Sequence, residues 1–81
     1  MTPEHLTREL QDKRLRIEFN DGQTDDVLLL LVSECDEHEE CRGIEYDVIS
    51  TNRPDRIRKG AACWAHLKDI RNFEVFGDPN V

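Results

Sequence analysis

The sequence predicts an all-β fold of five strands that curl into a small barrel, preceded by a short N-terminal helix. Apolar and polar residues alternate in the segments 14–20, 43–50 and 72–76, which is typical of strands buried on one face. Asn20-Asp21-Gly22 favours a tight turn between antiparallel strands. With 81 residues we expect one domain over residues 1–81.

The N-terminal helix is expected over residues 1–13. Thr2 can cap it, Pro3 suits the first helical position, and Glu4 lies at the positive end of the helix dipole. Leu6 and Leu10 are four residues apart on one helical face. This face would pack the helix onto the barrel, which is expected over residues 14–76.

The first two strands form a predicted hairpin around the Asn-Asp-Gly turn. The second strand is expected over residues 24–34 and contains an unbroken apolar run at 27–32. Such a run predicts either burial on both faces or a bent strand whose two ends face different cores. The first strand has its apolar side chains on one side: Leu15, Ile17 and Phe19.

The other strands follow an acidic turn at 36–40 and a polar, basic loop at 51–60. They are expected at 43–50, 61–66 and 72–76, with one helical turn at 67–70. Their inward side chains are predicted to be Ile44, Tyr46, Val48, Phe73 and Val75.

The formal net charge of −7 argues against general nucleic-acid binding, which depends on Lys and Arg. No apolar stretch approaches the roughly 20 residues of a membrane span, and the N-terminus has no signal-peptide apolar region. We therefore expect a cytoplasmic protein with reduced thiols and no membrane partner.

Three segments resemble a known family: LRIEFNDGQ, IEYDVIST and AHLKDIRNFEV. Together with the order of elements, they are similar to SH3/Sm-like small barrels and to the bacterial Rho-binding antiterminator family. The resemblance implies a barrel that binds RNA or a protein and is not an enzyme. Sm-like proteins often form rings by pairing the fourth strand of one subunit with the fifth of the next. The antiterminator relatives are acidic and bind a basic protein surface.

The cysteines and histidines are spaced like metal ligands, as C-x2-H-x2-C and C-x2-H. Zinc prefers four thiolate and imidazole ligands in a tetrahedron. The candidate ligands are Cys35, Cys41, Cys63 and His66, with His38 as a substitute. Two alternatives stay open: inert thiols, with Cys63 as a small core residue, or a disulfide between Cys35 and Cys41.

Catalytic motifs are not found, and we expect no enzyme and no catalytic residue. The sequence has no Gly-rich phosphate loop, GxSxG or HExxH. Cys63 and His66 are three apart on a predicted strand and so point to opposite faces. Asp25 and Asp26 are adjacent and would also point apart.

The basic loop is the predicted binding site for a ligand or partner. It contains Arg53, Arg56, Arg58 and Lys59, which could bind an anion, an RNA backbone or an acidic protein segment. The loop could instead close on the acidic turn at 36–40. Trp64 could stack on a base if exposed, although a lone Trp in a small barrel is more often buried.

The sequence therefore predicts a small, non-enzymatic binding module that holds a protein partner, for which a basic surface would suit the acidic chain. The alternatives are an RNA-binding protein that uses the loop at 53–59, and a zinc-stabilised domain. Self-association is also expected, because the fourth and fifth strands have apolar edges that need cover.

Overall fold

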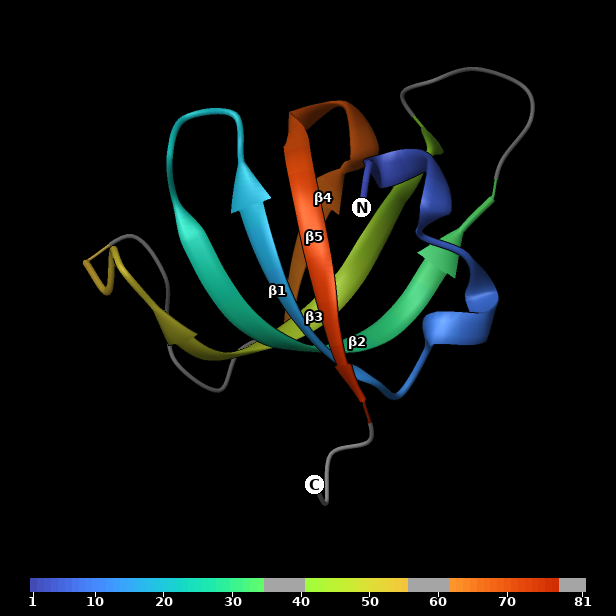
Figure 1. The fold of residues 1–81 in the computed structure, drawn as a ribbon, viewed down its shortest axis with the longest axis horizontal. Helices are drawn as coiled ribbons and strands as arrows, with labels where there is room; N and C mark the ends of the chain where they lie inside the picture. The colour runs from blue at the N-terminus through green and yellow to red at the C-terminus, as the bar shows by residue number, and fades with distance from the viewer. Residues whose placement is uncertain (35–40, 56–61, 78–81) are drawn as a thin grey trace.

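The computed structural model describes residues 1–34, 41–55 and 62–77. They form one antiparallel five-stranded sheet in the order β4-β3-β2-β1-β5. Figure 1 shows the long, strongly bent strands in its centre. The all-β prediction is confirmed, and the sheet is open, with β4 and β5 at its two edges. The strands are β1 (Arg14–Phe19), β2 (Thr24–Ser33), β3 (Gly43–Thr51), β4 (Ala62–His66) and β5 (Ile70–Gly77).

The N-terminal segment contains two separate 3-10 turns in place of the single helix expected over 1–13. These are η1 (Pro3–His5) and η2 (Arg8–Leu10). Leu6 and Thr7 between them are extended, with ψ angles of 100° and 168°. The break lets Leu6, only 3% exposed, enter the core, while Leu10 packs against it. Both leucines anchor the segment as expected, although not from one helical face.

The β1–β2 hairpin forms at the predicted turn. The Phe19 N–H donates to the Gln23 carbonyl at 2.8 Å, and the Gly22 N–H donates to the Phe19 carbonyl at 3.0 Å. Gly22 has a φ of +91°, a region that a residue with a Cβ adopts only at a cost. The Asn-Asp-Gly sequence therefore sets the register of the hairpin.

The apolar run in β2 is not buried on both faces. Val27 and Leu29 are buried, Leu31 is 45% exposed, and Val32 is buried again. The pairing with β3 skips a residue between Leu29 and Leu31, which marks a β-bulge at Leu30. Because the bulge adds one residue, the side chains after it switch to the opposite faces of the sheet. An unbroken apolar run can therefore belong to a strand that has one buried face.

The core lies on the concave side of the bent sheet. Leu15, Ile17 and Phe73 are fully buried, whereas Phe19 and Val75 are partly buried against the core. The three inward residues predicted on β3 are also buried: Ile44, Tyr46 and Val48. Strand alternation therefore predicted the inward face correctly.

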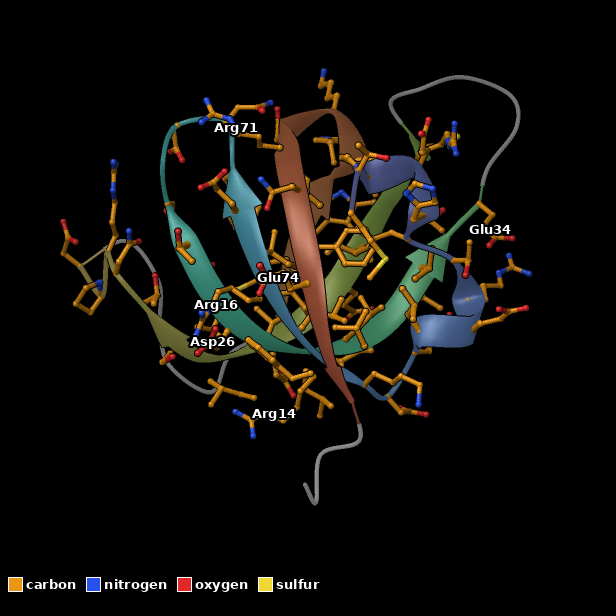
Figure 2. The ribbon with its side chains drawn as sticks, in the orientation of Figure 1. Arg14, Arg16, Asp26, Glu34, Arg71 and Glu74 are labelled. Carbon is orange, nitrogen blue, oxygen red and sulfur yellow. The ribbon has the colours of Figure 1, made fainter. Side chains whose placement is uncertain are left out.

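The outer face of the sheet is held by a polar network. The Arg16 Nε donates to Asp26 Oδ1 at 2.9 Å, and Figure 2 shows these side chains meeting from β1 and β2. The Arg16 guanidinium also lies 5.0 Å from the centre of the Phe76 ring. Hydrogen bonding to Arg16 lowers the pKa of Asp26. Asp25 is buried on the other face, so the two aspartates point apart as predicted.

The two edge strands differ in their cover. On β5, the Phe73 N–H donates to the Met1 carbonyl at 2.9 Å, and the Met1 amine donates to the Phe73 carbonyl at 2.8 Å. On β4, the sheet has no further hydrogen-bonded strand within the described ranges.

Among the described residues, no helix is long and apolar enough to span a membrane.

Candidate functional site

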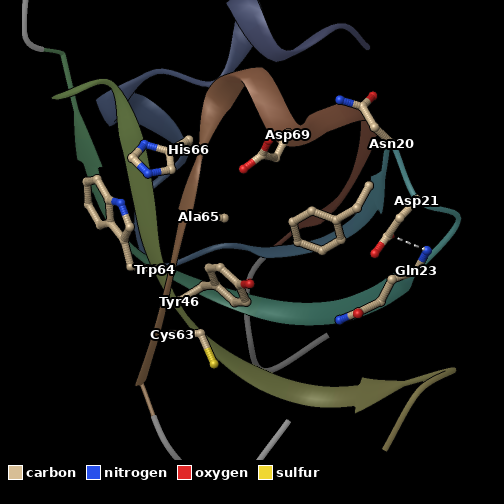
Figure 3. A pocket seen from close by; sticks show the side chains of 10 residues that line it. Asn20, Asp21, Gln23, Tyr46, Cys63, Trp64, Ala65, His66 and Asp69 are labelled. Atoms are coloured by element: carbon tan, nitrogen blue, oxygen red, sulfur yellow. Dashed lines mark hydrogen bonds between the residues drawn. The ribbon is translucent and has the colours of Figure 1, made fainter. Parts of the chain in front are cut away.

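A cleft of about 480 Å³ lies between β4 and the β1–β2 turn (Figure 3). The bend of the sheet brings the edge strand β4 opposite the end of β1. The cleft is lined by Phe19, Asn20, Asp21, Gln23, Tyr46, Cys63, Trp64, Ala65, His66 and Asp69.

A buried polar pair lies at the Gln23 side of the cleft. The Gln23 Nε2 donates to both Asp25 oxygens, each at 3.1 Å. Asp25 is 0% exposed, on the same face of β2 as Val27 and Leu29. Burial of a carboxyl group that has no hydrogen-bond donor costs on the order of several kcal/mol, because the group loses its hydration. The Gln23 amide replaces part of that hydration. The pair also fixes the orientation of the Gln23 amide.

Tyr46 and Cys63 face each other across paired strands β3 and β4. Burial raises the pKa of Tyr46, and the neighbouring Cys63 and Asp25 add smaller effects in the same direction. Burial also raises the pKa of the Cys63 thiol, with Asp25 and Asp47 contributing. A thiol with a raised pKa is a poor nucleophile at neutral pH. This geometry gives no support to a Cys63–His66 catalytic pair.

The rim of the cleft contains two aspartates, Asp21 and Asp69. Asn20 fixes it, because its N–H donates to the Asp69 carbonyl at 2.9 Å and its Nδ2 donates to the Lys68 carbonyl at 2.8 Å. These bonds tie the 3-10 turn η4 (Leu67–Asp69) to the β1–β2 turn. Asp21 and Asp69 are exposed and bring two carboxylates to the cleft, whose described lining contains no Lys or Arg. Two arginines lie just outside this lining, because Arg53 Nη2 donates to the Asp21 carbonyl at 3.1 Å and Arg71 Nη2 donates to the Asn20 carbonyl at 3.3 Å.

Aromatic rings supply the apolar part of the cleft and of the adjoining edge. Phe19 and Tyr46 lie with ring centres 6.4 Å apart at 38°. Trp64 is 47% exposed, which is the exposed alternative of the two that the sequence left open. Its indole lies over Gly43, where a Cβ would come within 2.5 Å of the ring. The absence of a side chain at Gly43 therefore sets the position of Trp64.

The basic loop is only partly described. Arg53 is half-buried, and its Nη2 donates to the Asp21 carbonyl at 3.1 Å. It therefore connects the end of β3 to the β1–β2 turn. Arg56, Arg58 and Lys59 lie outside the described residues, as do the acidic residues of the 36–40 turn.

The proposed metal ligands are also divided. Cys35 lies outside the described residues, Cys41 is disulfide-bonded, and Cys63 is half-buried and forms no disulfide. The expectation of reduced thiols is therefore wrong for Cys41, whose sulfur is not available as a thiolate ligand. The His66 Nδ1 is buried without a hydrogen-bond partner within the described part of the chain, and its ring meets Trp64 edge-on at 6.3 Å. In residues 1–34, 41–55 and 62–77, no group of three or more His, Cys, Asp or Glu could hold a metal ion.

Sequence reasoning missed Gln23 and Asp69, which line the cleft, and Asp25, which is buried and accepts hydrogen bonds from Gln23. Asp25 had a signal, because it has the same parity on β2 as the buried Val27 and Leu29. Gln23 and Asp69 had none, because their positions depend on contacts between segments far apart in the sequence.

The chain matches no protein-family model, no curated protein and no solved structure. The resemblance to Sm-like and Rho-binding antiterminator proteins therefore stays a prediction, and the geometry of the cleft carries the functional argument.

Proposed function

We propose that this chain is a small, non-enzymatic, cytosolic interaction module that holds a basic segment of a protein partner. The observation that carries the proposal is the cleft beside β4, which combines aromatic rings with the carboxylates of Asp21 and Asp69 and has no Lys or Arg in its described lining. Carboxylates and aromatic faces both attract cationic side chains. The net charge of −7 would also steer a basic partner toward the molecule.

The bent sheet supports an SH3/Sm-like barrel as the scaffold of this module. The order β4-β3-β2-β1-β5 joins consecutive strands by hairpins and brings β5 back beside β1. Curling of the sheet places the cleft at the seam between β4 and the end of β1. The seam is thus where a partner segment would complete the barrel.

Capture of partners from a cell lysate by the immobilised chain tests this function. The variant Asp69→Lys reverses a charge on the cleft rim, and Glu9→Lys reverses an exposed charge on η2 as the matched control. We expect basic proteins to be captured, with less captured by Asp69→Lys than by Glu9→Lys, and nuclease treatment to have no effect. Equal capture by both variants would contradict the proposal.

RNA binding is the second candidate, favoured by the exposure of Trp64 and by the basic residues at 53–59 in the sequence. In that case, Arg56→Glu should abolish capture, and nuclease should remove the captured material. Affinity for RNA should also fall steeply with salt.

A further inference from the structure

We infer that the partner's basic segment binds as an added strand on the edge of β4 that no strand of the described sheet pairs, with an Arg or Lys side chain in the adjoining cleft. This inference rests on the proposed function and adds the mode of binding and the side chain that is recognised. In strand addition, backbone hydrogen bonds supply affinity, and pockets for alternate side chains supply specificity.

The position of β4 supports strand addition. It is an edge strand of the described sheet, paired only with β3 in the hydrogen-bonded order. Ala62 and Trp64 on this strand are exposed, and no Pro interrupts it. An edge strand without charges or Pro of its own is a template for another strand. The sequence ACWAH carries neither within the described strand.

The cleft beside this edge supports a cationic side chain. Side chains of an added strand alternate between the two faces of the sheet, so every second one would point toward the concave side. There, Tyr46 and Phe19 would contact the aliphatic stem of Arg or Lys. The cationic end would reach the rim, where Asp69 is exposed.

A second copy of this chain is a weaker occupant of the same edge. Its β5 would have to release the paired backbone of Met1 and Phe73, which closes that edge at its centre. Two chains of net charge −7 also repel each other. A basic segment meets neither obstacle.

The test uses a short blocked peptide of alternating Val and Arg, with two peptide controls and two protein variants. In the first peptide control, Glu replaces Arg, and in the second, alternate backbone nitrogens are methylated. The protein variant that removes a rim charge is Asp69→Asn. Its control is Asp12→Asn on the exposed loop before β1, where a φ of 70° suits Asn. Fluorescence of Trp64, the single tryptophan, reports binding at the edge.

Strand addition predicts that only the unmethylated Val/Arg peptide binds well. Asp69→Asn should weaken binding about two- to fivefold, the size of one exposed ion pair, and Asp12→Asn should leave it unchanged. With the chain about four-fifths saturated, hydrogen exchange of alternate β4 amides should slow about fivefold, because only the free chain exchanges.

Other results separate failure of the inference from failure of the proposed function. If the peptide binds without protecting β4 amides, or the methylated peptide binds equally, strand addition is wrong and the acidic interaction module stands. Capture of basic proteins without any binding of the peptide has the same meaning. If neither is bound, both proposals are overturned. Occupation of the edge by a second copy, shown by a dimer mass and pre-protected β4 amides, also overturns the inference.

Discussion

At the scale of single residues, the Gln23–Asp25 pair is a polar contact inside the core, where an unpaired polar group would destabilise the fold. Gln23 supplies the two donor contacts that Asp25 has among the described hydrogen bonds. We predict that Gln23→Met lowers the free energy of unfolding by about 1–3 kcal/mol, because a buried acceptor loses its partner. The double variant Gln23→Met with Asp25→Leu should regain much of this loss, because both polar groups are then gone. Denaturant unfolding measures both, and an additive loss in the double variant would contradict a coupled pair.

Tyr46 gives the molecule a predicted sensitivity to alkali. Its pKa is raised in the folded state, mainly by burial, so the folded chain keeps the phenol proton when the unfolded chain releases it. The stabilisation is complete below the ordinary phenol pKa of about 10 and is lost as pH rises above it. The free energy of unfolding should fall by about 1.4 kcal/mol per pH unit in this window.

The variant Tyr46→Phe tests this pH dependence. It removes the only tyrosine, so the loss of stability above pH about 10 should become less steep. Cys63, whose pKa is also raised, should add an earlier decline that Cys63→Ala removes. Tyrosinate absorbance of the folded protein reports the group directly. A normal titration near pH 10 would show that burial does not act as argued.

At the scale of elements, the sequence predicted each strand to within a few residues, because each has one face in the core. Leu15, Ile17 and Phe73 alternate with polar residues, and this pattern survives folding. The run at 27–32 is unbroken although the strand buries one face, because a bulge at Leu30 shifts the alternation. A bulge depends on pairing with β3, which is not encoded locally. The break at Leu6 likewise depends on a core contact that helix capping signals do not contain.

The β1–β2 turn provides the prediction at this scale. Gly22 has a φ of +91°, and a Cβ there would meet only Arg53 Nη2 at 3.8 Å, an ordinary contact. Gly22→Ala should therefore destabilise the fold by about 1–2 kcal/mol through its backbone alone. Gly22→Asn should cost less, because Asn tolerates this region. Thermal unfolding of the two variants distinguishes backbone strain from a steric clash, which would make the larger Asn worse than Ala.

At the scale of the whole molecule, the fold class was predictable and the cleft was not. Alternation and the Asn-Asp-Gly turn are local, so they predicted five antiparallel strands. The cleft joins Gln23 on the hairpin, Tyr46 on β3 and Asp69 after β4. It exists because the sheet bends, and the degree of bending follows from bulges and packing that single-sequence patterns do not determine. Of the predicted basic site, the structure describes Arg53, and its Nη2 donates a hydrogen bond to the Asp21 carbonyl.

The N-terminal segment suggests how the expected self-association is controlled. Met1 pairs with Phe73 through two backbone hydrogen bonds and so covers the centre of the β5 edge. Pairing of β5 with β4 of another copy requires that edge. The segment 1–5 would then act as an edge guard, in the way that natural sheets protect exposed strands.

Deletion of residues 2–5 tests the guard, because Met1 would then join Leu6 directly and could no longer reach Phe73 in its present register. We predict greater self-association of the deletion variant than of the full chain, measured by sedimentation over a range of micromolar concentrations. The full chain should stay closer to its single-chain mass of 9.5 kDa. Glu4→Ala is the matched control, because it changes η1 without removing the backbone of Met1. Near-equal thermal stability of the variants would exclude association through unfolded chains, and equal masses for the deletion variant and the full chain would show that the β5 edge needs no guard.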